Sequence, residues 1–172
     1  MNSFILLVPF LFVRFAYMSH LRSDTVGRAA HFAPVKGKEQ IAYIIYQITQ
    51  AAIIIILCIS TIHTDSWLFY VGMFLYLLGL AVCTVSIHDF AYPNSSGLNT
   101  GGMYRFSRNP MYVAYFIFFL GCAILIESRI LIGSILLFQL SAHWIILAEE
   151  RWCFDNFKEE YGEYCKRTRR YL

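Results

Sequence analysis

The feature that most constrains this chain is a series of apolar runs, each close to the length of a membrane-spanning helix. Five such runs cover residues 3–18, 41–63, 67–88, 111–126 and 130–148. A helix needs about 20 mostly apolar residues to cross the roughly 30 Å hydrocarbon core of a bilayer. The runs show no period-two alternation, and an open sheet edge is not tolerated in lipid. The sequence therefore predicts an all-α, polytopic membrane protein with about five transmembrane helices and a cytoplasmic C-terminal amphipathic helix.

Composition supports this class of protein. The chain is 58% hydrophobic and only 15% charged, whereas soluble domains carry about 25% charged residues. This excludes an ordinary soluble enzyme, a disordered protein and a disulfide-stapled secreted domain. The length of 172 residues predicts one membrane-embedded domain, with three spans in residues 1–88 and a loop, two spans and a tail in residues 89–172. Arg14 lies near the end of the first run, where its long side chain is expected to snorkel to the interface.

The placement of the cations predicts the orientation in the membrane. Segments 19–40, 89–110 and the tail after residue 148 hold twelve of the 14 Lys and Arg residues. Cytoplasmic loops carry the excess of Lys and Arg, so we expect these segments and the C-terminus inside and the N-terminus outside. The short links 64–66 and 127–129 predict antiparallel helical hairpins on the outer side. The net charge of +3 is mild, and no basic, aromatic-interleaved stripe predicts a nucleic-acid partner.

Most of the polar residues that can do chemistry fall in the loop from Asp89 to Tyr112 and in the tail. The loop is rich in turn-forming Gly, Pro, Asn and Ser residues. Pro110 suits the first turn of the following helix, and Arg105 and Arg108 precede this helix start. Together they form a candidate anion site at the membrane surface. The alternative is that both arginines are anchors that face lipid phosphates.

The second candidate cluster is the pair Glu149-Glu150, which follows the last apolar run. Carboxylates next to hydrocarbon are costly and usually find cationic partners. If the helix continues beyond this point, Glu150 shares a face with His143 and Leu147. The alternative is a solvated helix face at the interface. The aromatic residues of the tail suit either an interfacial helix or a cover over the loop, and the sequence does not choose between them.

Histidines and cysteines give weaker signals. The five cysteines are scattered without a C-x-x-C pair, which supports neither disulfides nor a thiolate metal site. His88 and His143 both fall toward the cytoplasmic half, so a haem site with two histidine ligands stays open as an alternative. On that alternative the chain is a non-catalytic helical membrane protein, such as a haem-binding cytochrome-like subunit.

Three motifs of the C-terminal half resemble a known family. Residues 100–112, TGGMYRFSRNPMY, look like the G-x-Y-R-x-x-R-[HN]-P-x-Y signature of integral-membrane S-adenosylmethionine-dependent methyltransferases. That superfamily includes isoprenylcysteine carboxyl methyltransferases and phospholipid methyltransferases. Glu149-Glu150 resembles its paired glutamates at a fitting distance. Phe157, Tyr161 and Tyr164 resemble its aromatic tail motif.

The resemblance implies a cofactor, an acceptor and a set of site residues. The cofactor is S-adenosylmethionine, with no metal, and the acceptor is a lipophilic small molecule or membrane lipid that enters sideways at the cytoplasmic face. Glu149, Glu150 and Arg108 are the expected catalytic residues. The expected cofactor-binding residues are Ser96, Gly97, Leu98, Asn99, Tyr104, Asn109, Pro110, Met111, Tyr112 and Glu150.

Departures from the family pattern bear on the acceptor. Asn109 stands where isoprenylcysteine enzymes have His, and Lys158 replaces a Gly of the tail motif. Residues 144–148 lack the arginine that helps those enzymes hold a substrate carboxylate. A prenylcysteine carboxylate is therefore less favoured. A lipid headgroup amine and a small hydrophobic carboxylate or thiol all stay open, and an amine would require deprotonation, with which Glu149 or Glu150 can assist.

Overall fold

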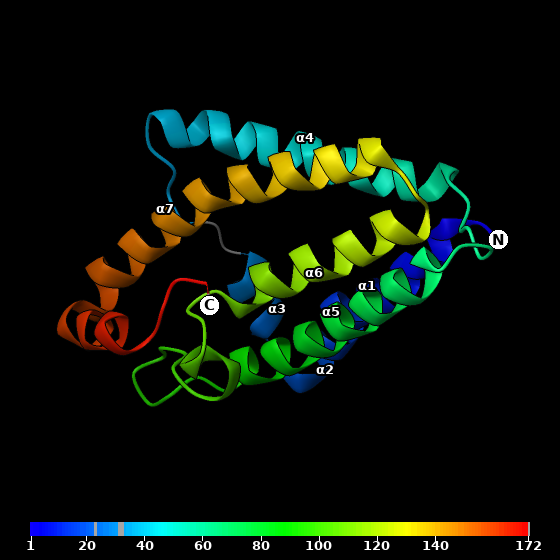
Figure 1. Ribbon diagram of the computed structural model, residues 1–172. Coiled ribbons are helices and arrows are strands. Elements are labelled where there is room, and N and C mark those ends of the chain that lie inside the picture. The colour runs from blue at the N-terminus through cyan, green and yellow to red at the C-terminus, as the bar shows by residue number, and fades with distance from the viewer. Residues whose placement is uncertain (23, 31–32, 172) are drawn as a thin grey trace.

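The computed structural model describes residues 1–22, 24–30 and 33–171, and the described chain is all-helical, as predicted (Figure 1). The four long C-terminal helices are α4 (Lys38–Ile59), α5 (Leu68–Ala91), α6 (Pro110–Leu125) and α7 (Arg129–Arg167). A short 3-10 turn, η3 (Gly102–Arg105), lies in the loop before α6. Asn109 is the N-cap of α6 and Pro110 occupies its first turn, which confirms the prediction for this proline.

The N-terminal run forms one continuous helical rod of changing pitch. It consists of η1 (Ser3–Leu6), α1 (Leu7–Leu11), η2 (Phe12–Tyr17) and α2 (Met18–Leu21), and the short α3 (Thr25–Ala30) follows. The turns of η2 are π-helical, a geometry that is frequent at functional sites.

In the part of the chain that the structure describes, four helical segments are long and apolar enough to cross a membrane: Ser3–Leu21, α4, α5 and α7. The fourth predicted span is the helix α6, which is apolar but has only 16 residues. At 1.5 Å per residue its length falls short of the roughly 30 Å hydrocarbon core. The outer faces of the helices expose large apolar side chains such as Ile48, Ile55, Phe74 and Leu140. The chain is a multi-pass membrane protein.

Among the described helices, α5 and α6 make the most extensive contact. A Cβ atom added at Gly79 would collide with the backbone of Phe118, and one added at Gly121 would collide with the backbone of Tyr76. These two glycines therefore let the helix backbones touch, which is a common way for helices to associate in lipid.

Helix α4 packs along α7, while its neighbour in sequence, α5, packs along α6 (Figure 1). The link between α4 and α5 spans residues 60–67, so it is longer than the predicted three residues. This length lets the chain cross to the other helix pair instead of forming the expected tight hairpin of α4 and α5.

The N-terminal rod is part of the same core. The ring of Phe10 stacks on Phe118 at 4.7 Å between centroids, and the Tyr76 hydroxyl donates a hydrogen bond to the Leu6 carbonyl. At the rod's start, Ser3 donates to the Leu57 carbonyl in α4. The rod therefore lies in place against α4, α5 and α6, and its Arg14 lies inside the bundle rather than at a lipid-facing end.

Candidate active site

A cavity of about 390 Å³ lies at the end of the bundle where α6, α7 and the loop before α6 meet. Its volume is in the range of small-molecule sites. The C-terminal half of the chain lines it with three loop residues, with residues of the first turns of α6, and with one face of α7. These are Gly97, Leu98, Asn99, Met111, Tyr112, Tyr115, Glu149, Trp152, Cys153 and Phe157.

The remaining wall comes from elements N-terminal to the loop. Arg14 of η2, Arg28 and Ala29 of α3, and Ala33 form one part of it. Tyr46 of α4 and Phe90 of α5 complete this wall. Sequence reasoning missed this contribution, although a cation within an apolar run was a signal. Instead of snorkelling outward, the half-buried Arg14 side chain turns toward Ala29 and the cavity.

The structure brings half of the expected site residues together on the cavity wall. The residues Gly97, Leu98, Asn99, Met111, Tyr112 and Glu149 are on its lining. The other expected residues do not line it among the described part of the chain; they are Ser96, Tyr104, Arg108, Asn109, Pro110 and Glu150. Most of this second group takes part in contacts that hold the loop and the chain end in place.

Glu149 is the only carboxylate on the described lining of the cavity. Its Oε1 atom accepts a hydrogen bond of 3.0 Å from the Tyr112 hydroxyl. No Lys or Arg of the described residues lies within ion-pair distance of it. A half-buried carboxylate without a cation is energetically costly, so Glu149 is suited to receive a cationic group from a ligand.

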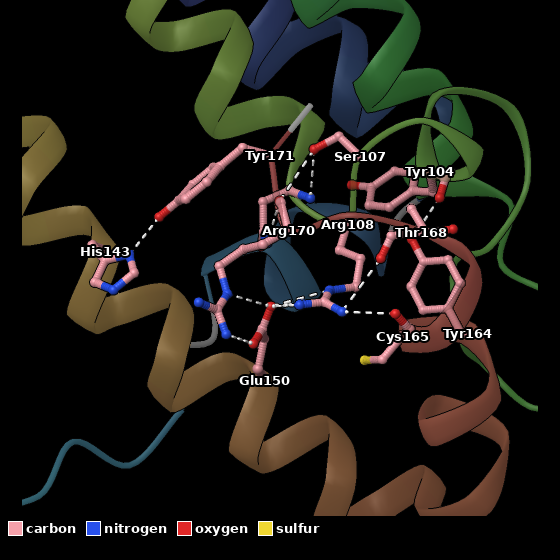
Figure 2. Close-up of polar contacts among 11 residues, drawn as sticks. Tyr104, Ser107, Arg108, His143, Glu150, Tyr164, Cys165, Thr168, Arg170 and Tyr171 are labelled. Atoms are coloured by element: carbon pink, nitrogen blue, oxygen red, sulfur yellow. Dashed lines mark hydrogen bonds and ion pairs between the residues drawn. The ribbon is translucent and has the colours of Figure 1, made fainter.

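Glu150, the next residue, lies in a different environment (Figure 2). Its Oε1 atom accepts hydrogen bonds from Arg108 Nη2 at 2.8 Å and from Arg170 Nε at 3.0 Å, and its Oε2 atom accepts one from Arg170 Nη2 at 2.8 Å. Arg108 also donates to the carbonyls of Cys165 and Thr168. We call Arg108, Glu150 and Arg170 the arginine–glutamate cluster. The Glu150 carboxylate raises the pKa of Arg170 further above its usual range, so this arginine stays charged.

The arginine–glutamate cluster fastens the end of the chain, residues 168–171, across the start of α6. The Arg108 amide donates to the Arg169 carbonyl at 2.9 Å, and the Asn109 side chain donates to the Arg170 carbonyl at 3.1 Å. Tyr171 then reaches α7, where its hydroxyl lies 2.7 Å from Nδ1 of His143 (Figure 2). Two of the expected site residues, Arg108 and Asn109, therefore hold this C-terminal strap.

A second set of contacts holds the loop under the tail. The Asn94 amide and the Ser96 hydroxyl both donate to Glu160, at 2.8 and 2.9 Å. The Tyr164 hydroxyl donates to the Tyr104 carbonyl at 2.6 Å. Burial raises the pKa of Tyr104 well above its ordinary value, so its phenol stays protonated. Of the two positions considered for the tail, the structure shows it packed on the loop.

Two backbone positions shape this region. Gly102 has a φ of +54°, and a Cβ atom there would collide with the Asp89 carboxylate that accepts a hydrogen bond from the Met103 amide. Within α7, Lys158 has a φ of +45° and interrupts the helical geometry. After this break the chain turns back toward the loop (Figure 1).

The histidines considered as haem ligands have other contacts. His143 pairs with Tyr171, and His88 lies exposed beside Asp89, 3.7 Å from its carboxylate. Neither histidine lines the cavity.

An all-helical membrane protein with a small-molecule cavity at one end of its bundle is the class that these observations define. The chain belongs to the phospholipid methyltransferase family, whose model matches residues 53–160, more than half of the chain. The matched residues contain the loop, α5, α6 and both glutamates, and this confirms the resemblance found in the sequence. No curated protein and no solved structure matched the chain significantly.

Proposed function

We propose that the chain is an S-adenosylmethionine-dependent methyltransferase that acts on the amine of a lipid-type acceptor. The observation that carries this proposal is the cavity carboxylate of Glu149, which has a hydroxyl partner, Tyr112, but no cation among the described residues. A methyltransferase for amines needs a group that holds the cationic amine and takes up its proton. A carboxylate in a partly desolvated cavity suits both tasks.

The loop side of the cavity fits the cofactor. Asn99 Oδ1 is buried and has no hydrogen-bond partner in the described chain, so a ligand N–H group would satisfy it. Gly97 has a φ of +93°, and its missing side chain lets a ligand approach the backbone closely. The aromatic rings of Tyr112 and Phe157 lie on the same lining and suit a sulfonium cation. When bound, the cofactor supplies a methyl group on a positively charged sulfur.

The residues of the chain then place the two reactants and accept the proton of the acceptor amine. The largely apolar walls keep water away from the acceptor, and fixed placement of two reactants provides a large part of many rate accelerations. Glu149 receives the proton that the acceptor amine must lose before its lone pair can react. Tyr112 holds the Glu149 carboxylate in one orientation through its 3.0 Å hydrogen bond.

Arg108 and Glu150 have a positioning role in this proposal. Arg108 and Glu150 form an ion pair with each other, and Glu150 also binds Arg170, so both side chains are engaged before any ligand arrives. This revises the expectation that both act on the cofactor or the acceptor directly. It leaves Glu149 as the proposed catalytic carboxylate, at the face expected to be cytoplasmic.

The test is methyl transfer by the purified protein. We expect label from S-adenosylmethionine carrying a radioactive methyl group to appear in an amine-containing lipid of a membrane lipid extract. We also expect calorimetry to show saturable binding of S-adenosylhomocysteine, the demethylated product of the cofactor. No saturable binding, or label only in carboxylate or thiol acceptors, would contradict the proposal.

A further inference from the structure

Two arginines from the N-terminal half line the same cavity as Glu149. Arg14 comes from the π-helical turns of η2, and Arg28 comes from α3. Both lie outside residues 53–160, the part of the chain that the family model matches. They add two positive charges to a cavity whose described lining contains a single carboxylate.

Arg14 has fewer partners than its guanidinium can use. The group carries five N–H donors, and its contacts within the described chain are the Met18 sulfur at 3.1 Å and the Ala29 carbonyl at 3.4 Å. Neither partner is charged. Cations within membrane spans normally pair with an anion or line a substrate path. Arg14 lines the cavity and has no anionic partner in the described chain, so it is available to an anionic ligand.

Arg28 is anchored by backbone carbonyls of α5 and by an ion pair with Asp24, but not all of its N–H donors are used in the described chain. Its Nη2 donates to the Phe90 carbonyl at 3.0 Å, and its guanidinium lies 4.9 Å from the centre of the Phe90 ring. Its Nε lies 3.4 Å from the half-exposed Asp24 carboxylate but makes no hydrogen bond in the described structure. The contacts with Phe90 fix the guanidinium beside the cavity and leave part of its donor set for a ligand.

We infer that Arg14 and Arg28 form the subsite that binds the acidic group, a phosphate or carboxylate, of the methyl acceptor. The inference rests on the proposed function, because it places the acceptor's anion at the arginines and its amine at Glu149. An anion of this kind is also present in the cofactor. The cofactor is common to the family, and the loop and helices that suit it lie inside the matched residues. The two arginines lie outside them, so we assign the arginines to the acceptor rather than to the cofactor.

The experiment compares cofactor and acceptor binding in detergent-solubilised variants. The variants are Arg14→Gln, Arg28→Gln and the charge-retaining Arg14→Lys, and the matched control is Arg129→Gln, which removes an exposed arginine at the start of α7. The probes are S-adenosylhomocysteine, a short-chain phosphatidylethanolamine and a long-chain alkylamine without phosphate. The readouts are the dissociation constant of each probe and the KM for methyl transfer.

We expect each glutamine variant to raise the dissociation constant and KM of the phosphate-bearing amine about tenfold, the usual effect of losing a charge-assisted hydrogen bond. The affinity for S-adenosylhomocysteine, which also reports an intact fold, should stay unchanged, as should binding of the alkylamine. Arg14→Lys should recover part of the loss. If Arg28→Gln fails to fold, the two Arg14 variants carry the test alone.

Other outcomes would contradict either the inference or the proposed function. An equal loss of affinity for S-adenosylhomocysteine would assign the arginines to the cofactor carboxylate. Equal effects on both amines, no effect on either, or no binding of the phosphate-bearing amine to the unmodified protein would remove the subsite. Arginine-dependent binding of that lipid without any methyl transfer would retain the subsite and overturn the proposed function instead.

Discussion

Glu149 and Glu150 are neighbours in the sequence, yet they lie in two regions that differ in almost every respect. Successive residues of a helix point about 100° apart, so one side chain faces the cavity and the other faces the chain end. Glu150 is bound by two arginines, whereas Glu149 has one hydroxyl partner and no cation in the described chain. The difference is the basis for the proposed roles: Glu150 holds the chain end through its arginines, and Glu149 is proposed to meet a ligand.

We expect the largest effect, on the rate of methyl transfer, from a substitution of Glu149, the glutamate that faces the cavity. Glu149→Gln keeps the size and hydrogen-bonding capacity of the side chain but removes its charge and its ability to take up a proton. We expect the rate of labelled methyl transfer to fall about 100-fold or more, with a nearly unchanged melting temperature. The matched control is Glu159→Gln, which changes an exposed glutamate of α7. Near-normal methyl transfer by the Glu149→Gln variant would contradict the catalytic role that we propose for Glu149.

The next effect comes from the arginine–glutamate cluster and concerns stability. Arg108→Ala removes a largely buried cation and leaves Glu150 with Arg170 alone. We expect a loss of about 2–3 kcal/mol in the free energy of unfolding, as for hydrogen bonds to a charged group, because Arg170 still pairs with Glu150. Denaturation in detergent would measure it, with the exposed Arg129→Ala as control.

A double-mutant cycle sharpens this second prediction. Adding Glu150→Gln to Arg108→Ala should cost less than it costs on its own, because Arg108 and Glu150 share an interaction, while the remaining cost reflects the contact of Glu150 with Arg170. Additive losses would show that Arg108 and Glu150 do not stabilise the chain as a pair.

We expect a smaller loss of methyl-transfer rate when the hydroxyl that orients the Glu149 carboxylate is removed. Tyr112→Phe removes the hydroxyl that binds this carboxylate. We expect roughly a tenfold lower transfer rate, from the loss of about 1–2 kcal/mol in one hydrogen bond to a charged group. The control is Tyr115→Phe, because that hydroxyl lies 4.0 Å from the Met111 sulfur, its one hydrogen-bond contact within the described residues. Equal losses in both variants would indicate a general effect on the cavity.

The smallest effect is expected at the break in α7. Lys158 has a positive φ, a conformation that disfavours side chains and favours glycine. The related tail motif has a glycine at this position. Lys158→Gly should therefore raise the free energy of unfolding by about 1 kcal/mol without changing methyl transfer. A destabilised variant would show that contacts of the lysine outweigh its backbone strain.

The features that follow from local sequence were predictable. Apolar runs predicted the helices, the position of Pro110 predicted the start of α6, and the motif residues predicted which loop and which helices meet. These are consequences of periodicity, of a missing amide hydrogen and of a recognisable pattern.

The features that depend on long-range packing were not predictable from the sequence. The choice between the two glutamates depends on where residues 168–171 come to lie, and no local pattern encodes that position. The direction of Arg14 depends on α3, where the Ala29 carbonyl accepts a hydrogen bond from its guanidinium. The pairing of α4 with α7 and of α5 with α6 joins segments whose mutual fit is not visible in either segment alone.

The central claim is that ligands of the methyl-transfer reaction occupy the cavity beside Glu149, and cysteine protection tests it most directly. Cys153 lines the cavity, whereas Cys58 near the end of α4 does not. The measurement is the rate at which a small thiol-alkylating reagent modifies each cysteine, followed by mass spectrometry, with and without saturating S-adenosylhomocysteine. The account predicts slower modification of Cys153 and an unchanged rate at Cys58. Modification of Cys153 at the same rate in the presence of the ligand would contradict it.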